Sequence, residues 1–124
     1  TAPVLKRLRC VVLEIFAREL ATWWRPMSDS PIPELQVGRR TDWVHTFSRD
    51  ARGALGRLRC GFQYRPGSKP STIAHGLFSL LDALPPDALT AIEIERTTTT
   101  RKLPREKLNA ALARFPKLGE VALP

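Results

Sequence analysis

The side chains best suited to chemistry are two cysteines and two histidines: Cys10, Cys60, His45 and His75. No two of them stand at the short spacing typical of zinc ligands, so we predict no metal site. Cys10 and Cys60 occupy the same place in two similar hexapeptides, where a free cysteine packs as a small apolar residue. An intervening strand would hold them too far apart for a disulfide, which favours an intracellular protein.

Two stretches are similar to parts of nucleotide-binding sites. Residues 67–72 resemble a phosphate-binding loop, but the first glycine is missing and Pro70 takes the serine or threonine position. Residues 98–108 are similar to the tail motif of adenylate-forming ligases, except that Arg101 replaces the glycine before Lys102. No nucleophile has a recognisable base, and no carboxylates are paired for acid–base work. We therefore expect no enzyme activity, no cofactor and no small-molecule substrate.

A hexapeptide of the form Leu-x-x-Leu-x-Cys recurs along the chain. Residues 5–10 and 55–60 are close copies, and residues 32–37, 89–94 and 118–123 are looser versions. The first positions are separated by 27, 23, 34 and 29 residues, a spacing that indicates a repeat array. Apolar residues at alternate positions predict a short strand that buries one face and exposes the other.

These five hexapeptides resemble the leucine-rich repeat family. The uneven intervals are similar to the irregular repeats of ribonuclease-inhibitor-like and F-box proteins. The resemblance implies an α/β solenoid, with a short parallel sheet on the concave face and helices on the convex face. It also implies a protein partner, as in the substrate receptors of ubiquitin ligases, although no F-box element is present in these residues.

Helices are predicted between most of the strands. The first helix spans the apolar positions from Leu13 to Trp24 and ends before Pro26. Thr41 or Asp42 begins a second helix that continues through Asp50. A third helix runs from Ser71 or Thr72 to Leu84, and the last begins near Pro104 with Leu108, Leu112 and Phe115 facing inward. The second strand, residues 34–37, has the weakest pattern of the five.

Parallel strands would stack the outward-facing hexapeptide positions into two rows. The first row is Arg7, Glu34, Arg57, Ala91 and Glu120, and the second is Arg9, Gln36, Arg59, Glu93 and Ala122. Opposite charges largely neighbour one another, so the rows can act as a cross-strand charge ladder, as a surface for a partner protein, or as both. The candidate partner-binding residues are Arg7, Arg9, Glu34, Gln36, Arg57, Arg59, Glu93 and Glu120.

Most of the net charge of +8 must lie outside these rows. Three loops that leave strands are basic, with Arg39, Arg40, Arg65, Lys69, Arg101 and Lys102. In a solenoid these loops share one rim, which would suit phosphate contacts with RNA. The alternative is a solvated edge that keeps the protein soluble.

Length and composition fit a single repeat domain over residues 1–124, because 43% hydrophobic content can supply a continuous core. No apolar run approaches the ~20 residues of a membrane span. The chain starts at Thr1 and both ends lie at predicted strands, so we expect a fragment of a larger chain or assembly. The sequence thus predicts a non-catalytic protein-binding or scaffold module. The alternative is a basic RNA-associated subunit of a large ribonucleoprotein such as a ribosome.

Overall fold

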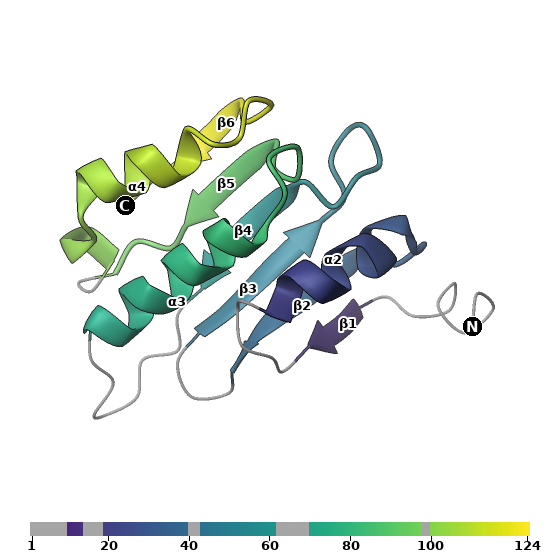
Figure 1. The fold of residues 1–124 in the computed structure, drawn as a ribbon, viewed down its shortest axis with the longest axis horizontal. Helices are drawn as coiled ribbons and strands as arrows, with labels where there is room; N and C mark the ends of the chain where they lie inside the picture. The colour runs from purple at the N-terminus through teal and green to yellow at the C-terminus, as the bar shows by residue number, and fades with distance from the viewer. Residues whose placement is uncertain (1–9, 14–18, 40–42, 62–69, 98–99) are drawn as a thin grey trace.

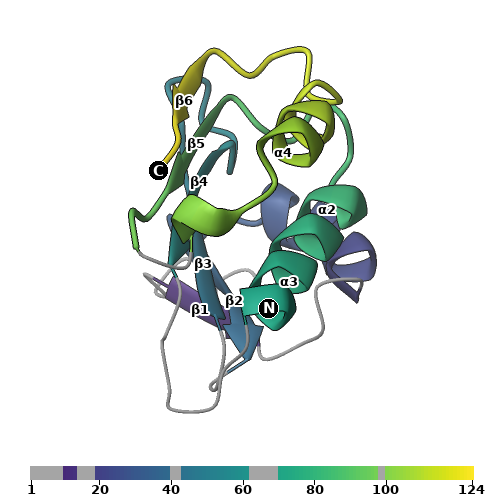
Figure 2. The same cartoon turned by 90° about the vertical axis from the view of Figure 1, so that its left-hand side faces the viewer.

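The computed structural model describes residues 10–13, 19–39, 43–61, 70–97 and 100–124. A six-stranded sheet, in the order β1-β2-β3-β4-β5-β6, forms one layer, and three helices cover one of its faces (Figures 1 and 2). The strands are β1 (Cys10–Leu13), β2 (Glu34–Arg39), β3 (Trp43–Ser48), β4 (Arg57–Gly61), β5 (Ala91–Ile94) and β6 (Glu120–Ala122). The helices are α2 (Leu20–Asp29), α3 (Pro70–Ala83) and α4 (Arg105–Leu112), with a 3-10 turn, η2 (Thr100–Lys102).

Five of the six strands run in the same direction. β1 pairs with β2 in parallel, and β4, β5 and β6 are parallel neighbours. β3 lies between β2 and β4 and is antiparallel to both. The mixed α/β architecture is therefore confirmed, whereas a purely parallel sheet of five strands is wrong because a sixth strand separates the second and third hexapeptides.

Four hexapeptides form strands in one common pattern. Each of these strands starts at the third residue of its hexapeptide: β2, β4, β5 and β6. The first residue of the hexapeptide is fully buried at Ile32, Leu55 and Leu89. The central apolar residue lies on the helix-covered face and is buried at Leu35, Leu58 and Ile92. The alternation of the sequence therefore predicted these four strands, and the buried face of β2, β4 and β5, whereas the central Val121 of β6 is 49% exposed.

The helix predicted from residue 41 or 42 to Asp50 is wrong, because this segment contains β3. Its side chains alternate in burial: His45 and Phe47 are fully buried, while Thr46 and Ser48 are partly exposed. Val44, Thr46 and Phe47 belong to the residue types that fit a pleated, half-buried surface. Pairing with two neighbouring strands satisfies the backbone of β3 on both sides, and this outweighs a local helix start.

The first strand and the first helix are displaced from their predicted positions. β1 begins at Cys10, where the predicted strand ended, and residues 5–9 lie outside the described part of the chain. α2 begins at Leu20 and continues through Pro26, where the helix was expected to have ended. Pro26 removes the N–H that would bond the carbonyl of Thr22. Thr22 is exposed, so water can satisfy that carbonyl and the helix continues.

The helix layer and one face of the sheet share a single apolar core. The predictions for α3 and α4 are confirmed, with Leu77, Leu80, Leu81, Leu84, Leu108, Leu112 and Phe115 all buried. α2 joins this core through Trp24, whose ring meets the ring of Phe47 edge-on at 4.8 Å between centroids. Within the described residues, no helix combines the length and the apolar character needed to cross a bilayer.

Arg49 and Asp50 tie the end of β3 to three other segments. The Arg49 guanidinium donates hydrogen bonds to the carbonyls of Ser28, Ser30, Ile32 and Gly53. The Asp50 carboxylate accepts hydrogen bonds from the backbone N–H of Arg52 (2.9 Å) and Ala54 (3.1 Å) and from the Thr90 hydroxyl (2.7 Å). Burial alone would raise the pKa of Asp50, but these hydrogen bonds and the Arg52 charge outweigh burial and lower that pKa.

Gly56 is required where these segments meet. A Cβ at this position would collide with the Asp50 carboxylate and lie 2.7 Å from the Thr90 hydroxyl oxygen. We predict that Gly56→Ala lowers the free energy of unfolding by about 1–3 kcal/mol, because it forces the Thr90–Asp50 hydrogen bond apart. Gly119→Ala is the matched control, since a Cβ there meets nothing within 4 Å. Urea unfolding that gives the same midpoint for both variants would contradict this account.

His45 gives the fold a dependence on pH. Burial lowers the pKa of His45 from 6.5 to about 3, so the unfolded chain binds a proton on His45 that the folded chain excludes. Stability should therefore fall as the pH drops below about 6.5, by at most about 1.4 kcal/mol per pH unit. We predict that His45→Leu removes this slope between pH 6.5 and 5, measured by urea unfolding. The change His75→Gln on the exposed surface of α3 should leave the slope in place.

Candidate protein-binding surface

The face of the sheet opposite the helices carries two rows of mainly polar and charged side chains. The strand register aligns Cys10, Glu34, Ser48, Arg57, Ala91 and Glu120 in one row. It aligns Val12, Gln36, Thr46, Arg59, Glu93 and Ala122 in the other. No helix among the described residues lies on this face (Figure 2). We refer to these twelve positions as the open face.

Half of the predicted row neighbours, those within β4, β5 and β6, are confirmed. Arg57, Ala91 and Glu120 are consecutive in one row, and Arg59, Glu93 and Ala122 are consecutive in the other. Glu34 and Gln36 belong to the same rows, but Ser48 and Thr46 of β3 separate them from the arginines. The row positions assigned to Arg7 and Arg9 are wrong, because Cys10 and Val12 occupy them. Arg7 and Arg9 themselves lie outside the described residues.

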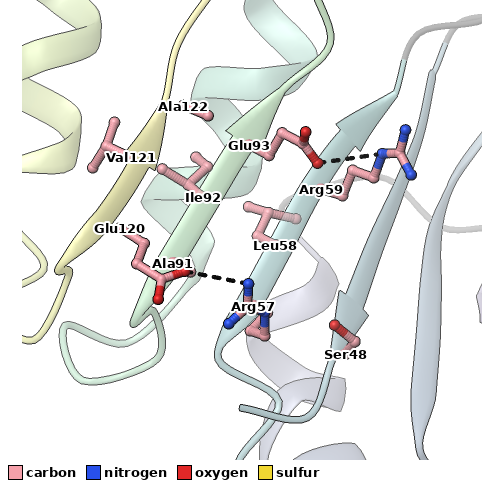
Figure 3. Close-up of a pocket in the computed structure, with 10 residues that line it drawn as sticks. All are labelled: Ser48, Arg57, Leu58, Arg59, Ala91, Ile92, Glu93, Glu120, Val121 and Ala122. Atoms are coloured by element: carbon pink, nitrogen blue, oxygen red, sulfur yellow. Dashed lines mark hydrogen bonds and ion pairs between the residues drawn. The ribbon is translucent and has the colours of Figure 1, made fainter. Parts of the chain in front are cut away.

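Two ion pairs cross the open face. Arg59 Nε lies 3.5 Å from Glu93 Oε2 on the adjacent strand. Arg57 Nη2 lies 3.2 Å from Glu120 Oε2, two strands away, and the small Ala91 side chain between them leaves the space for this contact (Figure 3). At least half of each of these four charged side chains is exposed, so each pair contributes little to folding and stays accessible to another molecule.

The same residues surround a hollow of about 390 Å³. It lies over β4, β5 and β6, with Ser48 of β3 at one side (Figure 3). Arg57, Arg59, Glu93 and Glu120 line it together with the apolar Ala91 and Ala122. A recess with donors, acceptors and apolar floor in one place can accept side chains from a partner. The sequence could not reveal this hollow. Its depth depends on the small side chains of Ala91 in β5 and Ala122 in β6, which come together only in the folded sheet.

The described cysteines and the buried histidine are poorly placed for catalysis. Burial raises the pKa of both the Cys60 and the Cys10 thiols, and Glu34 adds to the effect at Cys10. A protonated thiol is a weak nucleophile. Cys10 lies on the open face whereas Cys60 lies in the core, so the expectation that they occupy equivalent positions is wrong. Within the described ranges, no three His, Cys, Asp or Glu residues form a group that could hold a metal ion.

The predicted basic rim is described only in part. Because β2, β4 and β5 run in the same direction, the loops that follow them all leave the sheet at the carboxyl ends of these strands. Arg101 and Lys102 are exposed in η2, beyond β5, and Arg39 is the last residue of β2. The predictions for Arg40, Arg65 and Lys69 fall outside the described residues.

Comparisons with family models, with curated proteins and with solved structures found no match for this chain.

The ion pairs of the open face should be dispensable for folding. We predict that a double-mutant cycle of Arg59→Ala and Glu93→Ala gives a coupling energy below about 1 kcal/mol, because both side chains are mostly exposed. Leu58→Ala, one residue away but facing the core, should cost about 2–5 kcal/mol. A coupling energy as large as the Leu58 effect would make the charge ladder a principal source of stability instead of an accessible surface.

Proposed function

We propose that this chain is a non-catalytic protein-binding module of the irregular leucine-rich repeat type, and that the open face is its binding surface. The observation that carries the proposal is the hollow between the two ion pairs. It combines accessible charges of both signs with apolar surface, on a sheet face that no described helix covers. A face with no binding role needs no recess there, since exposed positions are free to carry larger side chains.

The repeat assignment is supported by equivalent burial in successive hexapeptides. The first and central apolar residues are buried in three of them, and the third residue begins a strand in four. α3 and α4 each connect two parallel strands and lie on the same face, as repeats of this kind require. β3 is a departure from the family pattern, because it fills one interval with an antiparallel strand instead of a helix.

The chemistry of the surface points to a partner segment with both acidic and basic side chains. Arg57 can exchange its ion pair with Glu120 for an ion pair with a carboxylate of the partner. Glu93 can likewise exchange its ion pair with Arg59 for one with a basic side chain of the partner. Such exchanges keep Arg57 and Glu93 paired in the interface, while Glu120 and Arg59, the more exposed member of each pair, can be hydrated or take a further partner group. Arg59 and Arg57 belong to the residue type that is most enriched among strong interface contacts, along with tryptophan and tyrosine.

RNA binding is the second candidate function. It is favoured by Arg101 and Lys102, which are both exposed in η2. This turn follows β5, at the end of the sheet where the loops after β2 and β4 also leave. The chain has a net charge of +8, and basic side chains at this end of the sheet could contact RNA phosphates without recognising the base sequence. The open face, in contrast, has nearly balanced charge and would attract a polyanion less.

Two variants with equal charge change separate these functions. We predict that the double change Arg57→Glu and Arg59→Glu weakens capture of a protein partner from nuclease-treated lysate at least tenfold. The double change Arg101→Glu and Lys102→Glu should leave this capture unchanged. Quantitative mass spectrometry of the captured proteins provides the measurement, and circular dichroism checks that both variants are folded.

Equal capture by the open-face variant and the wild type would exclude the open face as the binding surface. If capture disappears on nuclease treatment, and the Arg101 and Lys102 variant lowers the salt dependence of RNA binding, the second candidate function holds instead.

A further inference from the structure

The two edge strands carry most of the large apolar side chains that remain exposed. Among the described residues these are Val12 of β1 at 61% exposure, Val121 of β6 at 49%, and Trp23 of α2 at 44%. β1 and β6 are the two ends of the strand order, and α2 follows β1 in the chain. Exposed apolar side chains thus gather at the two ends of the sheet, with Val12 on the open face of β1 and Val121 on the helix-covered face of β6. Among the described strands β1 and β6 each have one neighbour only, and such edges favour pairing with another strand.

Val121 lies in line with buried core residues of the neighbouring strands, but no described strand lies on its far side. It is aligned with Ile92 of β5 and, through it, with Leu58 of β4. Leu58 and Ile92 are each 2% exposed, because a strand lies on both sides of them and helices lie above. Among the described strands, only β5 lies beside Val121. One more strand beside β6, with an apolar residue next to Val121, would complete the row.

β1 of a second copy has the direction and the pattern that this position requires. β1 and β6 run the same way within one twisted sheet, so a second copy that is rotated to continue the twist can pair its β1 with β6 in parallel. Continuing the register sets Glu120 beside Cys10 of the second copy and Val121 beside its Val11. Val11 already packs at the margin of the core, so the apolar row would continue from one copy to the next.

Charge favours this arrangement over the pairing of two β6 edges. The exposed charged residues of α4 and the turn after it are Arg105, Glu106, Lys107, Arg114 and Lys117, a net charge of +3. Those of α2 and the residue before it are Glu19, Arg25 and Asp29, a net charge of −1. Pairing β6 with β1 brings α4 toward α2 of the second copy, whereas pairing two β6 edges brings two basic helices together.

We propose that the β6 edge binds the β1 edge of a second copy of this chain, in parallel and head to tail. The contact is heterologous, so each copy keeps one unused edge and the association is open-ended. This inference does not depend on the proposed function, because the open face remains uncovered along the assembly.

Crosslinking in the expected register tests the contact directly. Glu120→Cys introduces a thiol that should lie one strand spacing from Cys10 of the second copy, roughly 4.8 Å between Cα atoms, which a disulfide tolerates. Within one chain the same two positions are five strand spacings apart, roughly 24 Å, so only an intermolecular bond can form. Mild oxidation should therefore produce a ladder of disulfide-linked species on a non-reducing gel.

Two controls make the result decisive. Adding Cys10→Ser to the Glu120→Cys variant should abolish the ladder, and Lys117→Cys, exposed nearby but outside the strand register, should not produce one. A ladder or dimer that persists with Cys10→Ser would show β6–β6 pairing and overturn the proposal. Absence of any crosslink with the Glu120→Cys variant at millimolar protein would overturn it as well.

Sedimentation of the unmodified protein gives an independent test. The weight-average mass of the wild type should rise above the 13.9 kDa of one chain as concentration increases. Val121→Lys, which places a charge in the apolar row at an already half-exposed position, should weaken this association at least tenfold. A wild type that stays monomeric at all concentrations, or a variant that associates equally well, would contradict the proposed contact.

Discussion

The register across the six strands is the constraint on which the rest of the structure depends. Side chains alternate between the two faces of a sheet, so a slip of one residue would move the charged rows into the core and the leucines into water. The contacts at the end of β3 oppose such a slip. The Asp50 carboxylate accepts a hydrogen bond from the hydroxyl of Thr90, which precedes β5. The Arg49 guanidinium donates hydrogen bonds to backbone carbonyls of the segment between α2 and β2. One pair of adjacent residues thus aligns strands on both sides of β3.

This constraint separates the two roles of the sheet. The helix-covered face holds the apolar residues that stabilise the fold, and the open face holds residues whose removal should cost little. Substitutions on the open face can therefore alter the proposed binding surface while the core stays intact. Such a division suits a binding module, because specificity and stability reside in different residues of the same strands.

The sequence predicted the strands whose apolar residues alternate, together with their direction and the open-face neighbours within β4, β5 and β6. It did not predict β3, because Trp43, Val44 and Phe47 fit a helical spacing as well as a strand, and only pairing with β2 and β4 decides between them. It also misplaced β1, since the alternation around Cys10 is compatible with a strand on either side of that residue. The hollow over β4, β5 and β6 depends on the depth left by Ala91 and Ala122, which a one-dimensional pattern does not contain.

The insertion of β3 also bears on the order in which the chain folds. β2, β3 and β4 are consecutive in sequence and form an antiparallel meander, so they come together by closing short loops. The pairings of β4 with β5 and of β5 with β6 each require a helix to form and dock between the strands, and they span more of the chain. The centre of the sheet can therefore nucleate folding, with growth proceeding outward to edges that order last.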